Sequence, residues 1–455
     1  FEGRFAHFDW PKRPDGLPDG EIDDVAGEVA MICPACGAEI KPRHKTAMNA
    51  DASWLKEGET IDANGVIGGS PRRSKIASFW LKGPAASFQS WESIVRNYLR
   101  ALESYQRTGD MQTLRSVTNV DFGEPFTPSA PAGTEVLDAE ALKARAEPDW
   151  KLGMVPPGVC ALVATVDVQK RHFDVQVTGL GAGFETWIVD RFQISQSAED
   201  KRLVNPGSYA EDWDLLWPLL SRGWKLADDP KREMRALCML VDSGGEAGVT
   251  GNAYAFAVRA RKQGISDARF ILLKGDAKVG ARRIALTRVD WSKDGKVLAK
   301  GLHLLLISSN DMKDDVAGGL KRETPGPGYV HTPKDLPADW YGEACAEQRT
   351  DAGWDKRSHS AHNEAFDHMC YARAALLRPP YRWDRVNWDG AALPGYAQPH
   401  DRNTMVRAIG DTAIVPDSAV AAPSAGPGAA PITLPAPRSI SSSLARLARL
   451  NARPG

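Results

Sequence analysis

Residues 160–167, Cys160-Ala161-Leu162-Val163-Ala164-Thr165-Val166-Asp167, decide how the fold of this chain is interpreted. The run is almost entirely apolar and partly β-branched, which is typical of a strand buried in the middle of a sheet. It ends in Asp167, and a charge at the end of a buried strand is costly unless it is paired or binds a cation. The stretch therefore predicts both the centre of a sheet and a first candidate functional residue.

The residues after this strand predict an antiparallel meander followed by alternating helices and strands. Phe173, Val175 and Val177 alternate with polar neighbours, and a turn at 179–183 leads into a third strand at 185–190. Farther on, the pattern predicts strands at 237–242, 270–273 and 302–307 and helices at 213–220, 253–263 and 362–377. This order predicts an α/β fold with one mixed sheet flanked by helices.

Further acids share the position of Asp167 at the ends of predicted elements. Asp242 ends the second strongly apolar strand, and Asp367 lies on the last predicted helix with Glu364 one turn before it, on the same helix face. Carboxylates that meet from separate elements repel one another, and a divalent metal removes that repulsion. Mg²⁺ or Mn²⁺ prefers carboxylate oxygens, and two such ions about 4 Å apart can promote phosphodiester cleavage.

Cys33 and Cys36 are close in sequence and flank a turn closed by Gly37. Two thiolates at this spacing are typical of one half of a zinc knuckle, and a structural zinc site needs four ligands. His7 and His44, or a second cysteine pair upstream of this chain, would complete the site, whereas a reduced pair without metal is the alternative. The cysteines form no secreted disulfide framework, so a reducing compartment is expected.

The chain has 455 residues and a formal net charge of -1, so a nucleic-acid partner would need a local basic patch. Lys274, at the end of a predicted strand, is a candidate contact for a phosphate, and the alternative is an ordinary surface lysine. Candidates for a DNA groove are Arg282, Arg283, Lys313 and Arg357, which otherwise form only a solvated face. The sequence has no signal peptide and no apolar run near the roughly 20 residues of a membrane span. It begins at Phe1 without start-like character, and we expect a fragment of a longer protein.

Several short motifs, in order along the chain, resemble the large terminase subunit of lambda-like phages over roughly residues 30–378. Residues 164–169, Ala-Thr-Val-Asp-Val-Gln, resemble the family's "TAGVDVQ", and residues 241–244, Val-Asp-Ser-Gly, resemble its "DSG". Residues 363–367, Asn-Glu-Ala-Phe-Asp, resemble its "RNEALD". Looser similarities lie at 33–37, 76–99, 117–125 and 179–190.

The resemblance implies an RNase H-like nuclease fold. In that fold the first strand, a later central strand and the last helix each supply an acid, and these places are filled here by Asp167, Asp242 and Asp367, with Glu364 as an accessory or alternative ligand. It implies two Mg²⁺ or Mn²⁺ ions and an endonuclease that cuts concatemeric double-stranded DNA during genome packaging.

The resemblance also implies three regions. Residues 1–150 are expected to be a partial zinc-binding and linker region after a missing ATPase domain, 151–378 the nuclease domain, and 379–455 a flexible Pro/Ala-rich tail with a short helix at 441–451. ATP is expected only in the missing domain, because this chain has no G-x-x-x-x-G-K-[ST] motif.

The partners that the resemblance implies are double-stranded DNA, the small terminase subunit, the capsid portal protein and further copies of the chain in the packaging motor. The tail is expected to dock on the portal, the location is the host cell cytoplasm, and no membrane is involved. Two other interpretations remain open: an RNase H-like transposase or junction resolvase, and a non-catalytic DNA-packaging or zinc-binding module whose acids only cap turns.

Overall fold

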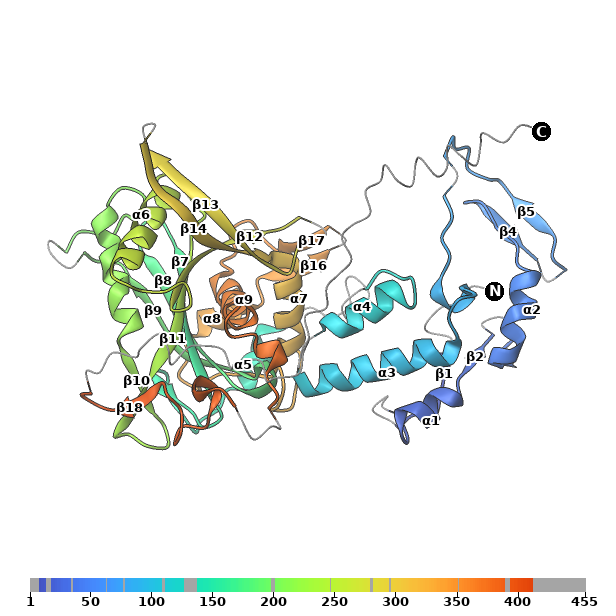
Figure 1. Cartoon of the computed structure of the whole chain (residues 1–455), viewed down its shortest axis with the longest axis horizontal. Coiled ribbons are helices and arrows are strands. Elements are labelled where there is room, and N and C mark those ends of the chain that lie inside the picture. Colours follow the sequence, from blue (N-terminus) through green and yellow to red (C-terminus); the bar gives the residue numbers. More distant parts are fainter. Residues whose placement is uncertain are drawn as a thin grey trace. The chain divides into compact units, whose positions relative to one another are not determined.

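The computed structural model describes most of the chain up to residue 411 (Figure 1). The described residues are 8–13, 18–33, 36–62, 64–76, 78–108, 111–126, 137–197, 201–245, 247–278, 281–293, 296–350, 352–388 and 393–411. His7, the helix predicted at 441–451 and the remaining tail after 411 lie outside these ranges.

The N-terminal region has a hydrophobic core of its own. Helix α3 (Trp91–Thr108) buries Trp91, Ile94, Val95 and Leu99, which recur at helical spacing, against a small antiparallel sheet with the strand order β1-β2-β3. The other elements are β1 (Phe8–Asp9), α1 (Ile22–Gly27), β2 (Ala30–Ile32), β3 (Glu39–Ile40), η2 (Pro42–His44), α2 (Lys45–Ala50), the β4–β5 hairpin (Glu59–Ile61 and Ile67–Gly69), η3 (Gly83–Ala85) and α4 (Gln112–Val120).

A mixed sheet of eleven strands within the described residues forms the centre of the larger core (Figure 1). Its main path runs β13-β14-β12-β11-β7-β8-β9-β15, and β6, β10 and β18 lie off this path. The strands are β6 (Met154–Val155), β7 (Ala161–Val168), β8 (Phe173–Leu180), β9 (Thr186–Ile194), β10 (Gly223–Leu226), β11 (Arg232–Asp242), β12 (Phe270–Asp276), β13 (Ile284–Lys293), β14 (Lys296–Ser308), β15 (Val330–His331) and β18 (Val406–Ala408).

The stretch that opens the sequence analysis forms β7, in the middle of this sheet. β7 pairs antiparallel with β8, and β8 pairs antiparallel with β9, which confirms the predicted meander. On its other side β7 pairs in parallel with β11, which in turn pairs in parallel with β12. The predicted α/β class with one mixed, helix-flanked sheet is therefore confirmed.

Helices cover both faces of the sheet. Phe173 of β8 packs edge-on against Trp213, with ring centroids 5.4 Å apart, and Phe256 contacts the same indole. The next residue, Asp174, contacts His368. Successive strand residues point to opposite faces, so η5 (Ala210–Leu220) and α6 (Val249–Lys262) lie opposite α9 (Glu364–Leu377). The other elements are α5 (Ala139–Ala144), η4 (Ala182–Phe184), α7 (Ser309–Leu320), α8 (Ala338–Ala344), the β16–β17 hairpin (Glu347–Thr350 and Gly353–Lys356), η6 (Trp383–Arg385) and η7 (Gly395–Ala397).

Two segments differ from the predicted elements. The helix predicted at 213–220 is a 3-10 helix, η5, which contains Pro218, a residue without a backbone N–H. Ordered structure also continues past residue 378, where the flexible tail is predicted to begin. Tyr381, Trp383 and Tyr396 are buried there, and β18 pairs with β11. These aromatic side chains hold a segment whose Pro and Gly content alone predicts disorder.

In the part of the chain that the structure describes, no helix has both the length and the apolar character that crossing a bilayer requires.

A half-buried ionic cluster ties the segment before β6 to the sheet. Both ring nitrogens of His331 face carboxylates, with Nδ1 2.6 Å from Glu147 Oε1 and Nε2 2.8 Å from Glu185 Oε1. The imidazole also stacks on Trp187, with centroids 4.5 Å apart. Burial alone would lower the pKa of His331, but the hydrogen bonds to Glu147 and Glu185 outweigh it and raise the pKa above 6.5. The folded state therefore favours the imidazolium form.

Replacing His331 with Gln is expected to destabilise the chain by about 2 kcal/mol at pH 6, because hydrogen bonds to charged groups contribute roughly 1.5–3 kcal/mol. The raised folded-state pKa makes this stabilisation complete below the unfolded-state pKa and lost as the pH rises through the folded-state pKa. Thermal unfolding should therefore separate wild type from His331→Gln strongly at pH 6 and weakly at pH 9. His359→Gln, at an exposed position, is the control. An equal separation at both pH values would contradict the assignment.

Candidate active site

Asp167 and Asp242 occupy neighbouring positions on the two central parallel strands. Val166 of β7 pairs with Val241 of β11, so the next residue of each strand is a carboxylate. Thr165, two residues before Asp167 and therefore on the same face, places its Oγ1 2.8 Å from Nδ1 of His368 on α9. Both carboxylates therefore project toward the α9 face of the sheet.

His368 fixes α9 against the sheet. Its Nε2 lies 3.3 Å from Asp174 Oδ1, and a carboxylate only accepts, so Nε2 carries the proton and Nδ1 accepts from Thr165. Burial lowers the pKa of His368 to about 4, which keeps the ring neutral. This contact sets the position of the preceding residue, Asp367, relative to β7.

Asp367 lies within a buried network of hydrogen bonds and ion pairs. Lys313 Nζ on α7 lies 3.1 Å from Asp367 Oδ1 and 2.7 Å from Glu347 Oε1 on β16. The Asn363 amide donates to Asp367 Oδ2 at 2.9 Å and also to Glu347. The Asn363 side chain, immediately before α9, therefore binds Asp367 and Glu347 instead of capping the helix.

Glu364 is joined to Asp167 through one amide. Gln169 Nε2 donates to Asp167 Oδ2 and, at 3.4 Å, to Glu364 Oε1. Glu364 Oε2 is buried and has no hydrogen-bond partner. An ionised oxygen in that position is costly without a proton or a cation.

The pKa shifts show that the four acids lie close enough for their charges to act on one another. Burial raises the pKa of Asp167 to about 7, and the negative charges of Asp242, Asp367 and Glu364 add to the effect. Burial also raises the pKa of Asp242. At Asp367 burial raises the pKa although Lys313 opposes it. Acids predicted from separate elements are thus brought together by the fold.

The donor set of these four acids fits hard divalent ions, which take carboxylate oxygens. Across the described ranges, however, no three His, Cys, Asp or Glu side chains converge closely enough to hold one ion. The acids are therefore neighbours that do not close around one position.

Several residues of the site are missed by the sequence analysis. Glu347 begins a short strand without a strong apolar pattern, and Gln169 lies inside a quoted motif but gives no signal of its own. Lys313, predicted to line a DNA groove, is only 9% exposed and paired with acids, so that interpretation is wrong. Arg283 is likewise engaged, with Asp315. Lys274 is exposed, and its charge acts on the pKa of Asp242, so it lies beside the site.

Two further basic candidates are Arg282 and Arg357, and no described contact joins either of them to Lys274 in one groove. Arg282 is exposed, whereas Arg357 is bonded to the backbone carbonyl of Leu137 at 3.1 Å.

Cys33 and Cys36 frame a tight turn between β2 and β3. The Gly37 N–H donates to Cys33 O at 2.8 Å, and the Gly37 φ of +72° is one that glycine adopts without strain. Both thiols are free of disulfides. The Nε2 of His44, a further candidate ligand, accepts from Arg43 Nε at 3.3 Å. Zinc binding at this turn remains a prediction.

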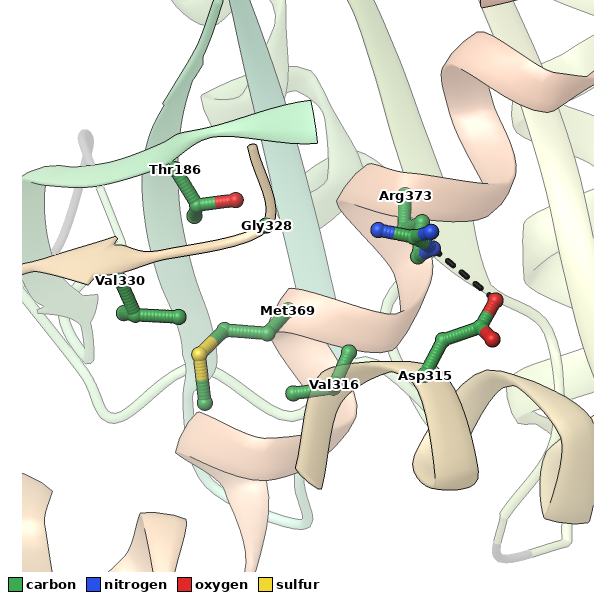
Figure 2. A pocket seen from close by; sticks show the side chains of 7 residues that line it. All are labelled: Thr186, Asp315, Val316, Gly328, Val330, Met369 and Arg373. Atoms are coloured by element: carbon green, nitrogen blue, oxygen red, sulfur yellow. Dashed lines mark hydrogen bonds and ion pairs between the residues drawn. The ribbon is translucent and has the colours of Figure 1, made fainter. Parts of the chain in front are cut away.

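A small cavity on the far side of α9 is a separate feature (Figure 2). Met369 and Arg373 line it from α9, and Val330 and Thr186 line it from the sheet edge. Arg373 donates to Asp315 across its rim at 3.0 Å. Met369 lies about 200° around the helix from Asp367, at 100° per residue, so the cavity does not open onto the acids.

The comparisons with known proteins agree on one family. A family model described as "Terminase large subunit gpA, endonuclease domain" matches residues 76–388, which include all four acids. The terminase large subunit of Escherichia phage lambda is 25% identical over 311 residues, 65% of this chain and 43% of that protein. The chain thus spans less than half the length of this curated relative. No solved structure gives a significant match.

Replacing Asp167 with Asn is expected to raise the melting temperature of the metal-free protein at pH 8. The folded-state pKa of about 7 exceeds the ordinary value of 3.8, so the wild type loses stability as the pH rises from about 4 to about 7. Asn carries no charge and avoids that loss. Thermal unfolding in chelator should show a gain at pH 8 that falls toward pH 4, with exposed Asp355→Asn as control. A pH-independent difference would exclude buried charge as the cause.

Proposed function

The chain belongs to the family of terminase large subunit gpA endonuclease domains, and we propose that it is the metal-dependent nuclease that cuts concatemeric double-stranded DNA during phage genome packaging. The observation that carries this proposal is the register of β7 and β11, which sets Asp167 beside Asp242 below Asp367 of α9. Clustered carboxylates can hold the metal ions that two-metal phosphodiester hydrolysis uses.

In this proposal Asp167, Asp242 and Asp367 hold two Mg²⁺ or Mn²⁺ ions, with Glu364 as a further ligand. The ions, when bound, supply activation of the attacking water and stabilisation of the leaving oxygen. The raised pKa of Asp167 belongs to the metal-free site, and a bound divalent ion would favour its ionised form. Lys274, exposed beside Asp242, is placed to contact a DNA phosphate.

The order of strands supports an RNase H-like nuclease. An antiparallel meander, β7-β8-β9, is followed by parallel strands β11 and β12 on the other side of β7. The first strand, a central parallel strand and the last long helix supply the acids. We propose this fold on that arrangement and on the family.

Asp167→Ala is expected to abolish nicking of supercoiled plasmid in Mg²⁺ or Mn²⁺, with a rate loss of roughly 10³-fold or more, since removal of a catalytic group costs on this order. Gel assays on wild type, Asp167→Ala and the exposed control Asp355→Asn measure it. Equal cleavage by wild type and Asp167→Ala would reject the site. Branched junction DNA in parallel reactions identifies a resolvase if it is preferred over linear duplex.

A broader proposal concerns the activity and partners of the whole protein, beyond the present chain. We propose that ATP is used by a domain outside this chain, and that the complete protein works as an oligomer in the host cell cytoplasm with the small terminase subunit and the capsid portal protein. A zinc ion at Cys33 and Cys36 is a separate proposal, which the metal content of the purified protein decides.

Deletion of residues 439–455 is expected to abolish packaging while leaving plasmid cleavage unchanged, because the acids lie far upstream in the sequence and the tail is proposed to dock on the portal. Packaging of DNA into empty capsids and plasmid nicking are measured on the same preparations of the complete protein that includes the ATP-using domain, with and without these residues. Packaging at the wild-type level would show that this segment does not dock.

A further inference from the structure

The acids of the site are neutralised unequally. Asp367 and Glu347 share the ammonium group of Lys313, at 3.1 Å and 2.7 Å. Within the described residues, neither Asp167 nor Asp242 forms an ion pair. Asp367 therefore already has a buried positive charge paired with it, whereas the exposed Lys274 acts on Asp242 without an ion pair.

Lys313 is fixed in place. Its Nζ lies 2.7 Å and 2.8 Å from the two oxygens of Glu347, and it lies 5.7 Å from the centre of the Phe366 ring. Lys313 is 9% exposed and Glu347 is 3% exposed. A lysine that is held by two carboxylates away from water keeps its proton and its position, and here the charges of Asp367 and Glu347 outweigh burial and raise its pKa.

Both oxygens of Asp367 are engaged. Oδ1 faces Lys313, and Oδ2 accepts from Asn363 at 2.9 Å. By contrast, Asp242 Oδ1 accepts from the Gly244 N–H at 3.0 Å, and Asp167 Oδ2 accepts from Gln169. Neither carboxylate is paired with a lysine within the described residues, so a cation there has no ammonium group to displace, whereas at Asp367 it has to displace a donor.

We propose that Lys313 is a positioning residue that fills the cation position at Asp367 in the metal-free site. An ion bound by Asp167 and Asp242 enters first, and an ion at Asp367 enters only in competition with the ammonium group. Lys313 thereby keeps Asp367 oriented toward the other acids and sets the affinity of the second ion. This inference rests on the proposed function.

The competition is electrostatic as well as steric. A divalent ion and an ammonium group repel one another, and the repulsion is strong where water is excluded. Glu347 gives Lys313 a place to remain when its contact with Asp367 opens. Glu347 therefore weakens the competition between Lys313 and the divalent ion. Without Glu347, Asp367 is the main anion that Lys313 can pair with.

Titration of the metal-free protein with Mn²⁺, with free Mn²⁺ followed by electron paramagnetic resonance, tests this inference. Wild type should show a tighter and a weaker class of sites. Lys313→Met should strengthen the weaker class about tenfold, which is within the usual range of coupling between sites, and leave the tighter class unchanged. Lys313→Arg should retain the weaker class. Lys262→Met, which removes an exposed charge from α6, is the matched control and should behave as wild type.

If Lys313→Met does not fold, Glu347→Gln tests the inference instead. This variant should lower the Mn²⁺ affinity of the weaker class of sites, because Lys313 then has Asp367 as its main anion. Unchanged Mn²⁺ affinities in both variants, beside a wild type that binds two ions and cuts DNA, would overturn this inference alone. A wild type that neither binds Mn²⁺ nor cuts DNA would overturn the proposed function and this inference with it.

Discussion

The parallel register of β7 and β11 is the constraint on which the site depends. It makes two carboxylates, Asp167 and Asp242, end neighbouring strands on the same face, where their charges oppose each other. Within the sheet, Lys274 of β12 offsets part of that repulsion at Asp242. The third side of the site comes from α9, which is held on this face by the neutral imidazole of His368. Burial of that imidazole thus supports the acid geometry without adding charge to it.

The fold tolerates the clustered charge because other charges around it are paired. Lys313 pairs with Glu347 and Asp367 and offsets one of their two charges, and Arg191 lies 2.6 Å from Asp174 and 2.8 Å from Glu343 behind the first turn of α9. Asp167 and Asp242 at the strand ends form no ion pair within the described residues. A net charge of -1 over the whole chain hides this local imbalance.

Sequence patterns predicted the parts of the fold that depend on repeated apolar positions. The hydrophobic runs of β7 and β11 and the closing helix were recognisable, and the acids at their ends followed from the cost of burying charge. Glu347 and Lys313 were not recognised as site residues, because short strands and single lysines carry no periodic signal and their roles arise only from tertiary contacts. The ordered structure that follows residue 378 is not predicted either, for a related reason. Its few aromatic residues keep the segment ordered despite its Pro and Gly content, because they are buried in the hydrophobic core.

The pairing of β18 with β11 bears on how this nuclease can be shortened. Residues 406–408 pair with the first residues of β11, and Met405 beside them is buried. Cutting the chain at residue 378 would leave the β11 backbone groups unpaired and remove Tyr381, Trp383 and Tyr396, which uncovers the part of the core that they pack against. An open strand edge next to uncovered apolar surface is a template for self-association. The smallest soluble unit with these acids in place should therefore keep its C-terminal extension through residue 411.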